Sequence, residues 1–312
     1  MGRIAGRYGI RGLGSAVSAV LDGGPRPSPQ RADAARSAPS RGASVRGSEH
    51  RVAIASMVGA CREAICRSSV RSSEIDVLFL GSPDPQRLWD LGGPELVAGI
   101  EISRRVRVVP IGTEISDFAT TLVLACEAIR DRRARSPLVV FGSCAQSPAA
   151  ANGHVTAAAG AAVVGESASL RLEDYAFVSV STEVDAPDEA VRGVGSSSIA
   201  ERGRTTMLGS MEAEVPVVAA ASLLRRNHVV SSEIALVADH MDPSVACGWV
   251  DRIQPKQHVV TALAGDNASG GAAVGLASLL DRLEVPHVVV LSSSSGCHVT
   301  AELFRRTGEG SR

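Results

Sequence analysis

The sequence predicts two similar α/β halves, because one order of strands and helices occurs twice in its 312 residues. Ser72–Leu78 reads Ser-Ser-Glu-Ile-Asp-Val-Leu, and 159 residues further on Ser231–Val237 reads Ser-Ser-Glu-Ile-Ala-Leu-Val. A second apolar segment follows each copy, Val108–Gly112 in the first and Val259–Leu263 in the second. A duplication of this size indicates two halves around a pseudo-twofold axis. We expect the loops after equivalent strands to meet at the middle of the molecule.

Composition limits the class of protein. Apolar residues make up 45% of the chain and aromatic residues only 3%, so we expect a core of small aliphatic side chains. The formal charge of −1 gives no reason to expect nucleic acid or an anionic membrane as a partner. No apolar segment follows Met1 and no apolar run approaches about 18 residues, so neither a secretion signal nor a membrane span is predicted.

The six cysteines predict reduced thiols in a cytoplasmic protein. None of them forms a Cys-x-x-Cys pair. Cys61 and Cys66 are five positions apart on a predicted helix, so they face different directions. We therefore predict no metal site.

The first half begins with a strand over 8–20. The stretch 22–49 is rich in Arg, Ser and Pro, and its arginines recur every five residues, a spacing that fits neither helix nor strand. We interpret it as a flexible, solvated loop, with a basic arm that binds a partner as the alternative. Apolar residues at helical spacing predict a helix over 52–67. Further elements are expected in this order: strands 75–80 and 98–109, helix 116–130, strands 138–142 and 160–165.

The second half repeats this order. Its apolar runs and polar turns predict helix 212–226, strand 234–238, helix 243–252, strand 258–262, helix 269–283 and strand 287–291. Alternating strands and helices predict mixed, mostly parallel sheets that are covered by helices.

Several motifs resemble the β-ketoacyl-acyl-carrier-protein synthase III family. They are the duplicated pattern, the opening Ile10-Arg11-Gly12-Leu13-Gly14-Ser15 and the carboxy-terminal motifs described below. The resemblance covers nearly the whole chain except 22–49. It implies a five-layered αβαβα, thiolase-like fold, with an amino-terminal half at 1–170 and a carboxy-terminal half at 171–312.

Two catalytic residues follow from the resemblance. His240 in Ala238-Asp239-His240 matches the family's catalytic histidine, directly after a strand of the second repeat. Asn267 in Gly265-Asp266-Asn267-Ala268-Ser269 is similar to the family's Gly-Asn-x-Ser turn, 27 residues further on. The resemblance implies that this pair stabilises the enolate formed when a malonyl thioester loses carbon dioxide. A general-base role for His240 is the other reading.

The family's nucleophilic cysteine has no counterpart in this sequence. Its position falls on Ile115, in Ile115-Ser116-Asp117-Phe118, where family members carry Cys-x-Gly-Phe. A helix amino terminus stabilises a thiolate, but a hydrocarbon side chain cannot use that field. The backbone N–H groups of Ile115 and Gly296 resemble the second oxyanion site and need no thiol.

Three readings of this loss remain open. First, Cys297 or Ser116 substitutes for the nucleophile, although Ser116 is turned about 100° from its neighbour around the helix. Second, the pocket works without a covalent intermediate. Third, the chain is an inactive subunit that pairs with an active ketosynthase.

The resemblance also implies substrates and partners. We expect an acyltransferase of polyketide or fatty-acyl metabolism that acts on acyl thioesters, forms a homodimer or a heterodimer, and holds no tightly bound cofactor. The region that carries an Arg and a Trp for coenzyme A in the family is not recognisable here, and Trp89 and Trp249 lie elsewhere. Acyl carrier protein is therefore at least as good a candidate for the thioester carrier as coenzyme A.

Overall fold

In the computed structural model, the residues described are 7–20, 42–82, 85–112, 118–146, 155–179, 213–240, 242–261, 271–294 and 298–308. Within these ranges, no helix is both long and apolar enough to span a bilayer.

Within the described residues, ten strands form two sets of five with the same internal order. The first set runs β3-β2-β4-β5-β1 and the second runs β8-β7-β9-β10-β6. The strands of the first set are β1 (Tyr8–Val20), β2 (Val77–Ser82), β3 (Arg107–Gly112), β4 (Pro137–Gln146) and β5 (Val155–Glu166). The second set is β6 (Leu170–Ser179), β7 (Ile234–Asp239), β8 (Gln257–Thr261), β9 (His287–Ser294) and β10 (His298–Arg306). This equivalence confirms the duplication that the repeated heptapeptide predicts.

The two sets join at a narrow seam. Only two residue pairs connect β1 to β6, Gly9 with Arg171 and Ile10 with Leu170. The backbones approach so closely there that a Cβ on Gly9 would lie 2.0 Å from the carbonyl oxygen of Leu170. Glycine is therefore required where one half meets the other.

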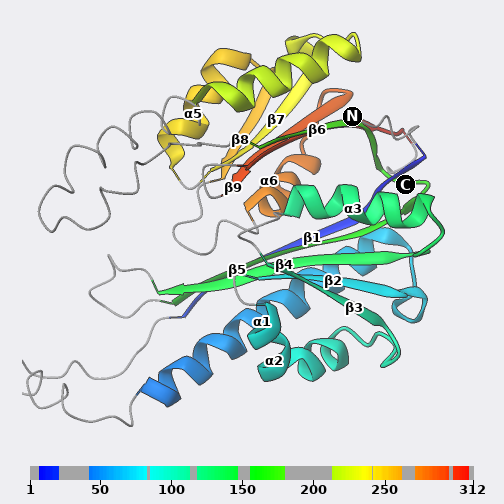
Figure 1. The fold of residues 1–312 in the computed structure, drawn as a ribbon, viewed down its shortest axis with the longest axis vertical. Coiled ribbons are helices and arrows are strands. Elements are labelled where there is room, and N and C mark those ends of the chain that lie inside the picture. The colour runs from blue at the N-terminus through cyan, green and yellow to red at the C-terminus, as the bar shows by residue number, and fades with distance from the viewer. Residues whose placement is uncertain are drawn as a thin grey trace, which may run out of the picture.

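Helices and sheets alternate in five layers (Figure 1). The helices α1 (Gly42–Ser68) and α2 (Pro85–Gly99) cover the outer face of the first set. Between the two sets lie α3 (Phe118–Arg130) and α6 (Gly271–Leu280). The outer face of the second set is covered by the helix at 213–226 and by α5 (Pro243–Ile253). The five-layered αβαβα fold is thus confirmed.

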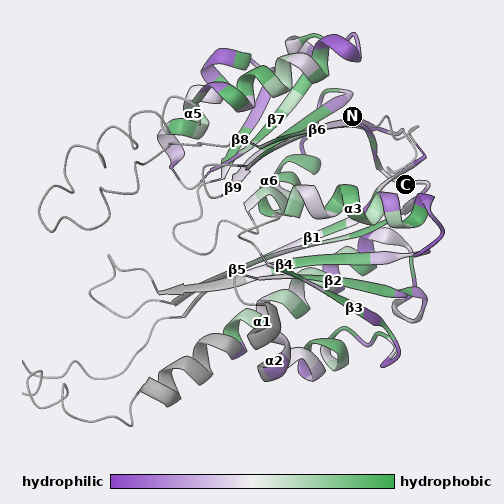
Figure 2. Cartoon of the chain, in the orientation of Figure 1, coloured by the Kyte–Doolittle hydropathy of each residue, from purple (hydrophilic) through white to green (hydrophobic). Residues whose placement is uncertain are grey.

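Strands β2 and β7 are buried on both faces, which explains why their sequences are continuously apolar. In β2, Val77 and Phe79 face the central core while Leu78 and Leu80 face the outer core. Each strand follows a 3₁₀ turn made by the repeated Ser-Ser-Glu, at Ser72–Glu74 and Ser231–Glu233. The hydropathy of the central helices agrees with their position, because both are largely apolar (Figure 2).

Some sequence-based expectations are wrong. Residues 98 and 99 end α2, and the strand begins only at Arg107. The Gly92-Gly93-Pro94 run discourages a helix prediction. In the fold, however, a Cβ on Gly92 would lie 2.6 Å from Ile54 Cγ1, so glycine lets α2 approach α1. Tertiary packing overrides local propensity at this place.

Two further expectations need correction. Residues 42–49 belong to α1 and not to the loop predicted over 22–49. The sheet is also not mostly parallel: four neighbouring strand pairs are parallel and five are antiparallel among the described strands. The strands β6 and β10, which the sequence analysis did not predict, take part in three of the antiparallel pairs.

Candidate functional site

His240 lies at the carboxyl end of β7 and is buried, with 6% of its surface exposed. Its backbone N–H donates to the carbonyl oxygen of Thr261, the last residue of β8, at 3.3 Å. The ring of Trp249 in α5 packs against the imidazole in a T-shaped arrangement, with the ring centroids 5.4 Å apart. The main chain and the packing therefore fix this histidine where two parallel strands end.

Asp242 holds one nitrogen of the His240 ring. The backbone N–H of Asp242 donates to His240 Nδ1 at 2.9 Å. Because Nδ1 accepts this bond, the neutral imidazole carries its proton on Nε2. The carbonyl oxygen of Asp242 also lies near Nδ1, at the longer distance of 3.2 Å. The shorter bond favours the tautomer in which Nε2 is a hydrogen-bond donor.

The same residue, Asp242, caps α5. Its Oδ1 accepts from the hydroxyl of Ser244 at 2.7 Å and from the backbone N–H of Ser244 at 2.8 Å. These bonds, the hydroxyl one foremost, hold the pKa of Asp242 below its ordinary value. The cap sets where α5 begins, and so it positions the N–H group that meets the imidazole.

Asp239 ties three elements together beside His240. Its Oδ1 accepts from Thr261 Oγ1 at 3.0 Å, and its Oδ2 accepts from the backbone N–H of Ala272 at 2.8 Å. A carboxylate at a helix amino terminus is stabilised by the unpaired N–H groups there. Asp239 therefore fixes the first turn of α6 against the ends of β7 and β8.

Five of the predicted site residues, Ile115, Ser116, Asn267, Gly296 and Cys297, lie outside the described residues, and their roles stay predictions. The described neighbours are Phe118 at the start of α3, Gly271 at the start of α6, the end of β9 at Ser294 and the start of β10 at His298. Sequence reasoning missed Trp249 and Thr261 as contacts of His240. Thr261 ends the repeat-equivalent strand, which was an available signal, whereas nothing in the sequence singled out Trp249.

Two described cysteines are unsuitable as replacement nucleophiles. Cys61 in α1 and Cys126 in α3 are buried, and desolvation raises the pKa of both thiols well above the ordinary value. Among the residues that the structure describes, no group of three or more His, Cys, Asp or Glu side chains could hold a metal ion.

No family of known sequences matches the chain, and no curated protein resembles it in sequence. Solved structures do resemble it. The 3-oxoacyl-[acyl-carrier-protein] synthase III of Aquifex aeolicus VF5 aligns over 96% of this chain and 99% of its own, with a TM-score of 0.63 and 13% identity. A variant of Xanthomonas campestris OleA gives a TM-score of 0.64 at 13% identity, over 98% of this chain and all of its own.

A third similar structure is the priming β-ketosynthase of the R1128 polyketide pathway. It is 17% identical and covers 97% of this chain and 98% of its own, with a TM-score of 0.61. The TM-scores of 0.61–0.64 over nearly the full length of each chain confirm the fold that the resemblance implies. The chain has the thiolase-like fold of the synthase III structures.

Proposed function

We propose that this protein acts on acyl thioesters as a condensing-type, synthase III-like protein, with His240 as a hydrogen-bond donor to the reacting oxygen. The observation that carries the proposal is the bond from the Asp242 N–H to His240 Nδ1, because it leaves the proton on Nε2. The fold supports the substrate class, since the similar solved structures are condensing enzymes by name.

The reaction that suits such a donor is the decarboxylation of a malonyl thioester. The bond between the carboxylate carbon and the α-carbon breaks, carbon dioxide leaves, and the electron pair becomes the enolate of an acetyl thioester. His240 Nε2–H and the amide of Asn267 would donate to the enolate oxygen. The α-carbon of the enolate then takes up a proton, or it attacks the carbonyl carbon of an acyl thioester, whose carbon–sulfur bond breaks and whose thiolate leaves. Donors placed in advance typically lower such a barrier by about 2.7–4 kcal/mol each.

A general-base role for His240 is the less favoured reading. A neutral imidazole that accepts at Nε2 must carry its proton on Nδ1. That proton would then face the Asp242 N–H, which lies 2.9 Å from Nδ1. Two donors facing each other repel, whereas the acceptor near Nδ1, the carbonyl oxygen of Asp242, lies at the longer distance of 3.2 Å, so the shorter contact disfavours this tautomer.

The chemistry does not require the missing thiol. The backbone N–H groups proposed at Ile115 and Gly296 would form a second oxyanion site, for the carbonyl oxygen of the acyl group that the enolate attacks. Acyl carrier protein is the proposed thioester carrier, with coenzyme A as the alternative, in polyketide or fatty-acyl metabolism.

The isoleucine at position 115 equally fits a second function, in which the chain supports an active ketosynthase as a dimer partner.

The test uses the purified chain with malonyl-acyl carrier protein and, separately, malonyl-coenzyme A. Conversion to the acetyl thioester is followed by mass spectrometry of the carrier. His240→Ala is expected to lower the rate by about 10²–10³-fold, the usual effect of losing one oxyanion donor. His240→Gln keeps an N–H donor and should retain part of the rate. The exposed His258 of β8 supplies the matched control, and His258→Ala should keep the full rate.

Other outcomes separate the remaining readings. Equal loss in His240→Ala and His240→Gln would contradict the donor role and favour a base. A stable acyl adduct in the intact mass that vanishes in Cys297→Ala or Ser116→Ala would identify a substitute nucleophile. No turnover of either thioester, combined with tight binding to a ketosynthase paralogue, would replace the enzymatic proposal with the partner role.

A further inference from the structure

A separate pocket of about 380 Å³ lies at the end of the molecule opposite His240. It is lined by Arg11, Gly12, Leu13, Arg67, Ser169, Leu280, Asp281, Arg306, Thr307 and Gly308. Arg306 ends β10, which runs antiparallel to β9, whereas His240 follows β7, which runs parallel to β9. The pocket therefore lies at the opposite ends of the strands from the proposed catalytic loops.

Both halves of the molecule contribute to this pocket, close to the seam between β1 and β6. Its walls are held by hydrogen bonds that do not depend on a ligand. Ser169 Oγ donates to the carbonyl oxygen of Ile10 at 3.0 Å, and the Thr307 N–H donates to the carbonyl oxygen of Ser169 at 3.0 Å. Thr307 Oγ1 donates to the carbonyl oxygen of Ala168 at 2.6 Å. The cavity is thus bounded by anchored backbone from β1, the β5–β6 turn and the end of β10.

A break in strand register places Arg11 in the pocket wall. Ile10 pairs with Val164 and Gly12 with Val163, so Arg11 is the extra residue of a β-bulge. Its side chain lies over Gly165, where a Cβ would be 2.7 Å from Arg11 Cδ. Bulges of this kind redirect a side chain, often at a binding site.

Three guanidinium groups face one carboxylate in the lining. Arg67 is neutralised, because it lies 2.9 Å from Glu63 and 3.8 Å from Asp281. Within the described part of the chain, no carboxylate lies within 4 Å of the guanidinium of Arg11 or Arg306. Glu74 acts on Arg11 only through a longer-range attraction and is paired with Arg71 at 2.9 Å. Two positive charges in the pocket wall therefore lack a close counter-ion.

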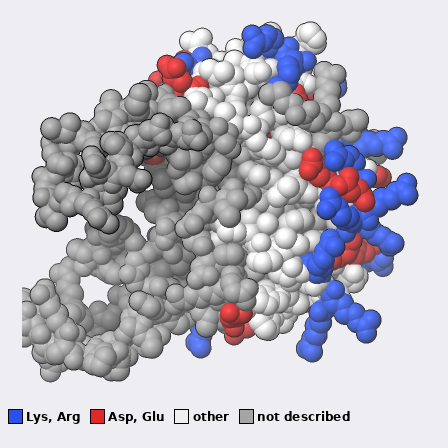
Figure 3. All heavy atoms as spheres, viewed as in Figure 1, with Lys and Arg blue, Asp and Glu red and all other residues white. Residues whose placement is uncertain are grey.

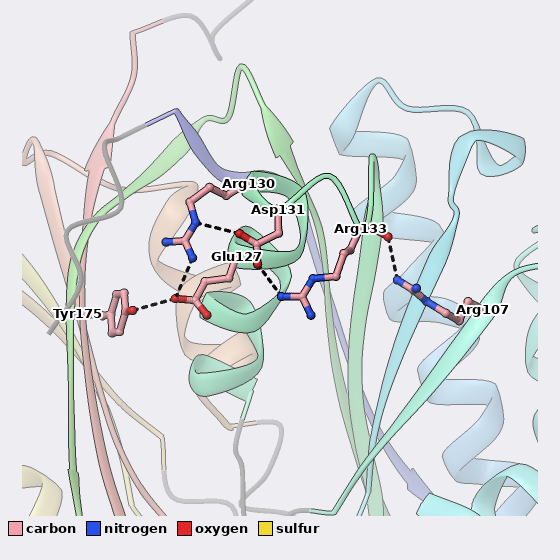
Figure 4. A network of polar contacts seen from close by, with 6 residues as sticks. All are labelled: Arg107, Glu127, Arg130, Asp131, Arg133 and Tyr175. Carbon is pink, nitrogen blue, oxygen red and sulfur yellow. Dashed lines mark hydrogen bonds and ion pairs between the residues drawn. The ribbon is translucent and has the colours of Figure 1, made fainter.

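The surface around this end of the molecule is also rich in arginine. Figure 3 shows blue side chains gathered along one edge, with fewer red ones between them. At the end of α3, Asp131 is shared by two arginines, Arg130 and Arg133 (Figure 4). A surface that is rich in one sign of charge raises the local concentration of the opposite ion.

We propose that this pocket is a binding site for a phosphate group, free or carried by a small phosphomonoester. A doubly charged tetrahedral oxyanion matches the guanidinium groups of Arg11 and Arg306, which have no carboxylate within 4 Å among the described residues. Arg306 Nη1 donates to the carbonyl oxygen of Leu283, and its other N–H groups face no described carboxylate. Guanidinium groups donate in pairs to phosphate oxygens. The cavity is at the lower end of the range for small-molecule sites, which leaves room for a short organic group beside the phosphate. Because the walls come from both halves, the bound anion would bridge them.

The experiment measures thermal unfolding of the full chain with sodium phosphate or glycerol 3-phosphate against sodium chloride at the same ionic strength. Phosphate at about ten times its dissociation constant is expected to raise Tm by about 2–4 °C. Arg11→Gln combined with Arg306→Gln should abolish the rise. The matched control changes two surface arginines outside the pocket, Arg105→Gln with Arg133→Gln, and should keep it.

Direct binding provides a second measurement if the double variant unfolds. Isothermal titration of the single variant Arg11→Gln should show at least tenfold weaker phosphate binding. The variant should fold, because the Arg11 guanidinium makes no hydrogen bond within the described residues. A stronger response to the ester than to free phosphate would identify a phosphomonoester as the ligand. An equal rise in chloride, or unchanged binding in Arg11→Gln, would overturn the proposal.

Discussion

Two adjacent residues at the end of β7 have different tasks. Asp239 is buried and holds β8 and the start of α6 together, whereas His240 presents its ring toward the cap of α5. A shift of Asp239 would move the first turn of α6. Asp239 therefore holds the end of β8 and the start of α6, the two elements that flank position 267 in the sequence.

Gly271 provides a test of this arrangement. A Cβ at Gly271 would lie 2.1 Å from Asp239 Oδ1, so Gly271→Ala must displace the carboxylate or the helix. We expect the free energy of unfolding to fall by about 1–3 kcal/mol, the usual cost of overpacking. Urea denaturation of the purified variant measures this change.

Gly248 in the middle of α5 is the matched control. Apart from its own helix backbone and chain neighbours, no described atom lies within 4 Å of a Cβ placed at this glycine. Gly248→Ala should therefore stabilise the protein by about 0.5–1 kcal/mol, because alanine loses less backbone entropy in a helix. Equal effects of the two substitutions would contradict the steric explanation.

At the scale of elements, one buried carboxylate attaches an outer helix to the second sheet. Asp174 of β6 accepts from Arg226 Nε at 3.0 Å and from Asn227 Nδ2 at 2.9 Å. Its side chain is 5% exposed and that of Arg226 is 31% exposed. Arg226 ends the helix at 213–226, so the bond fixes that end of the helix against the strand.

We predict that Asp174→Ala destabilises the fold by about 2 kcal/mol, because both donors lose their charged acceptor. Guanidinium chloride denaturation gives the value. The control is Asp131→Ala in the exposed network of Figure 4, which we expect to leave stability unchanged, since solvent replaces surface ion pairs. A comparable loss in both variants would show that burial is not what gives Asp174 its importance.

For the whole molecule, the central core is one cluster that includes residues from both halves. Thr120 of α3 also bonds Thr300 of β10, with the two hydroxyl oxygens 2.7 Å apart. These contacts are much more extensive than the two residue pairs of the β1–β6 seam. The halves should therefore unfold together, even though each one repeats the topology of the other.

The two tryptophans make this testable, because Trp89 packs on the outer core of the first half and Trp249 on that of the second. Trp89→Phe and Trp249→Phe each leave a single fluorescent reporter. Denaturation of each variant is followed by fluorescence and by circular dichroism. Both signals should show a single transition with the same midpoint. A fluorescence midpoint that departs from the dichroism midpoint in either variant would mean that the halves unfold separately.

The sequence alone determined the duplication, the order of most strands and the place of His240. The repeated Ser-Ser-Glu turns and the doubly buried strands are local patterns, and local patterns can be read along a chain. The resemblance to the synthase III family implied the αβαβα layers and the thiolase-like fold, which the structure confirms. The site residues near Asn267 and Ile115 were assigned by resemblance and remain predictions.

Only the tertiary structure decided features that depend on residues distant in sequence. The helix α2 exists because Gly92 lets it approach Ile54, against its own weak propensity. The tautomer of His240 depends on the cap of α5, and the arginine pocket brings Arg11 and Arg306 together from opposite ends of the chain. Packing and charge act through space, so periodicity along the chain could not reveal the approach of α2 to α1, the contact of His240 with the α5 cap or the arginine pocket.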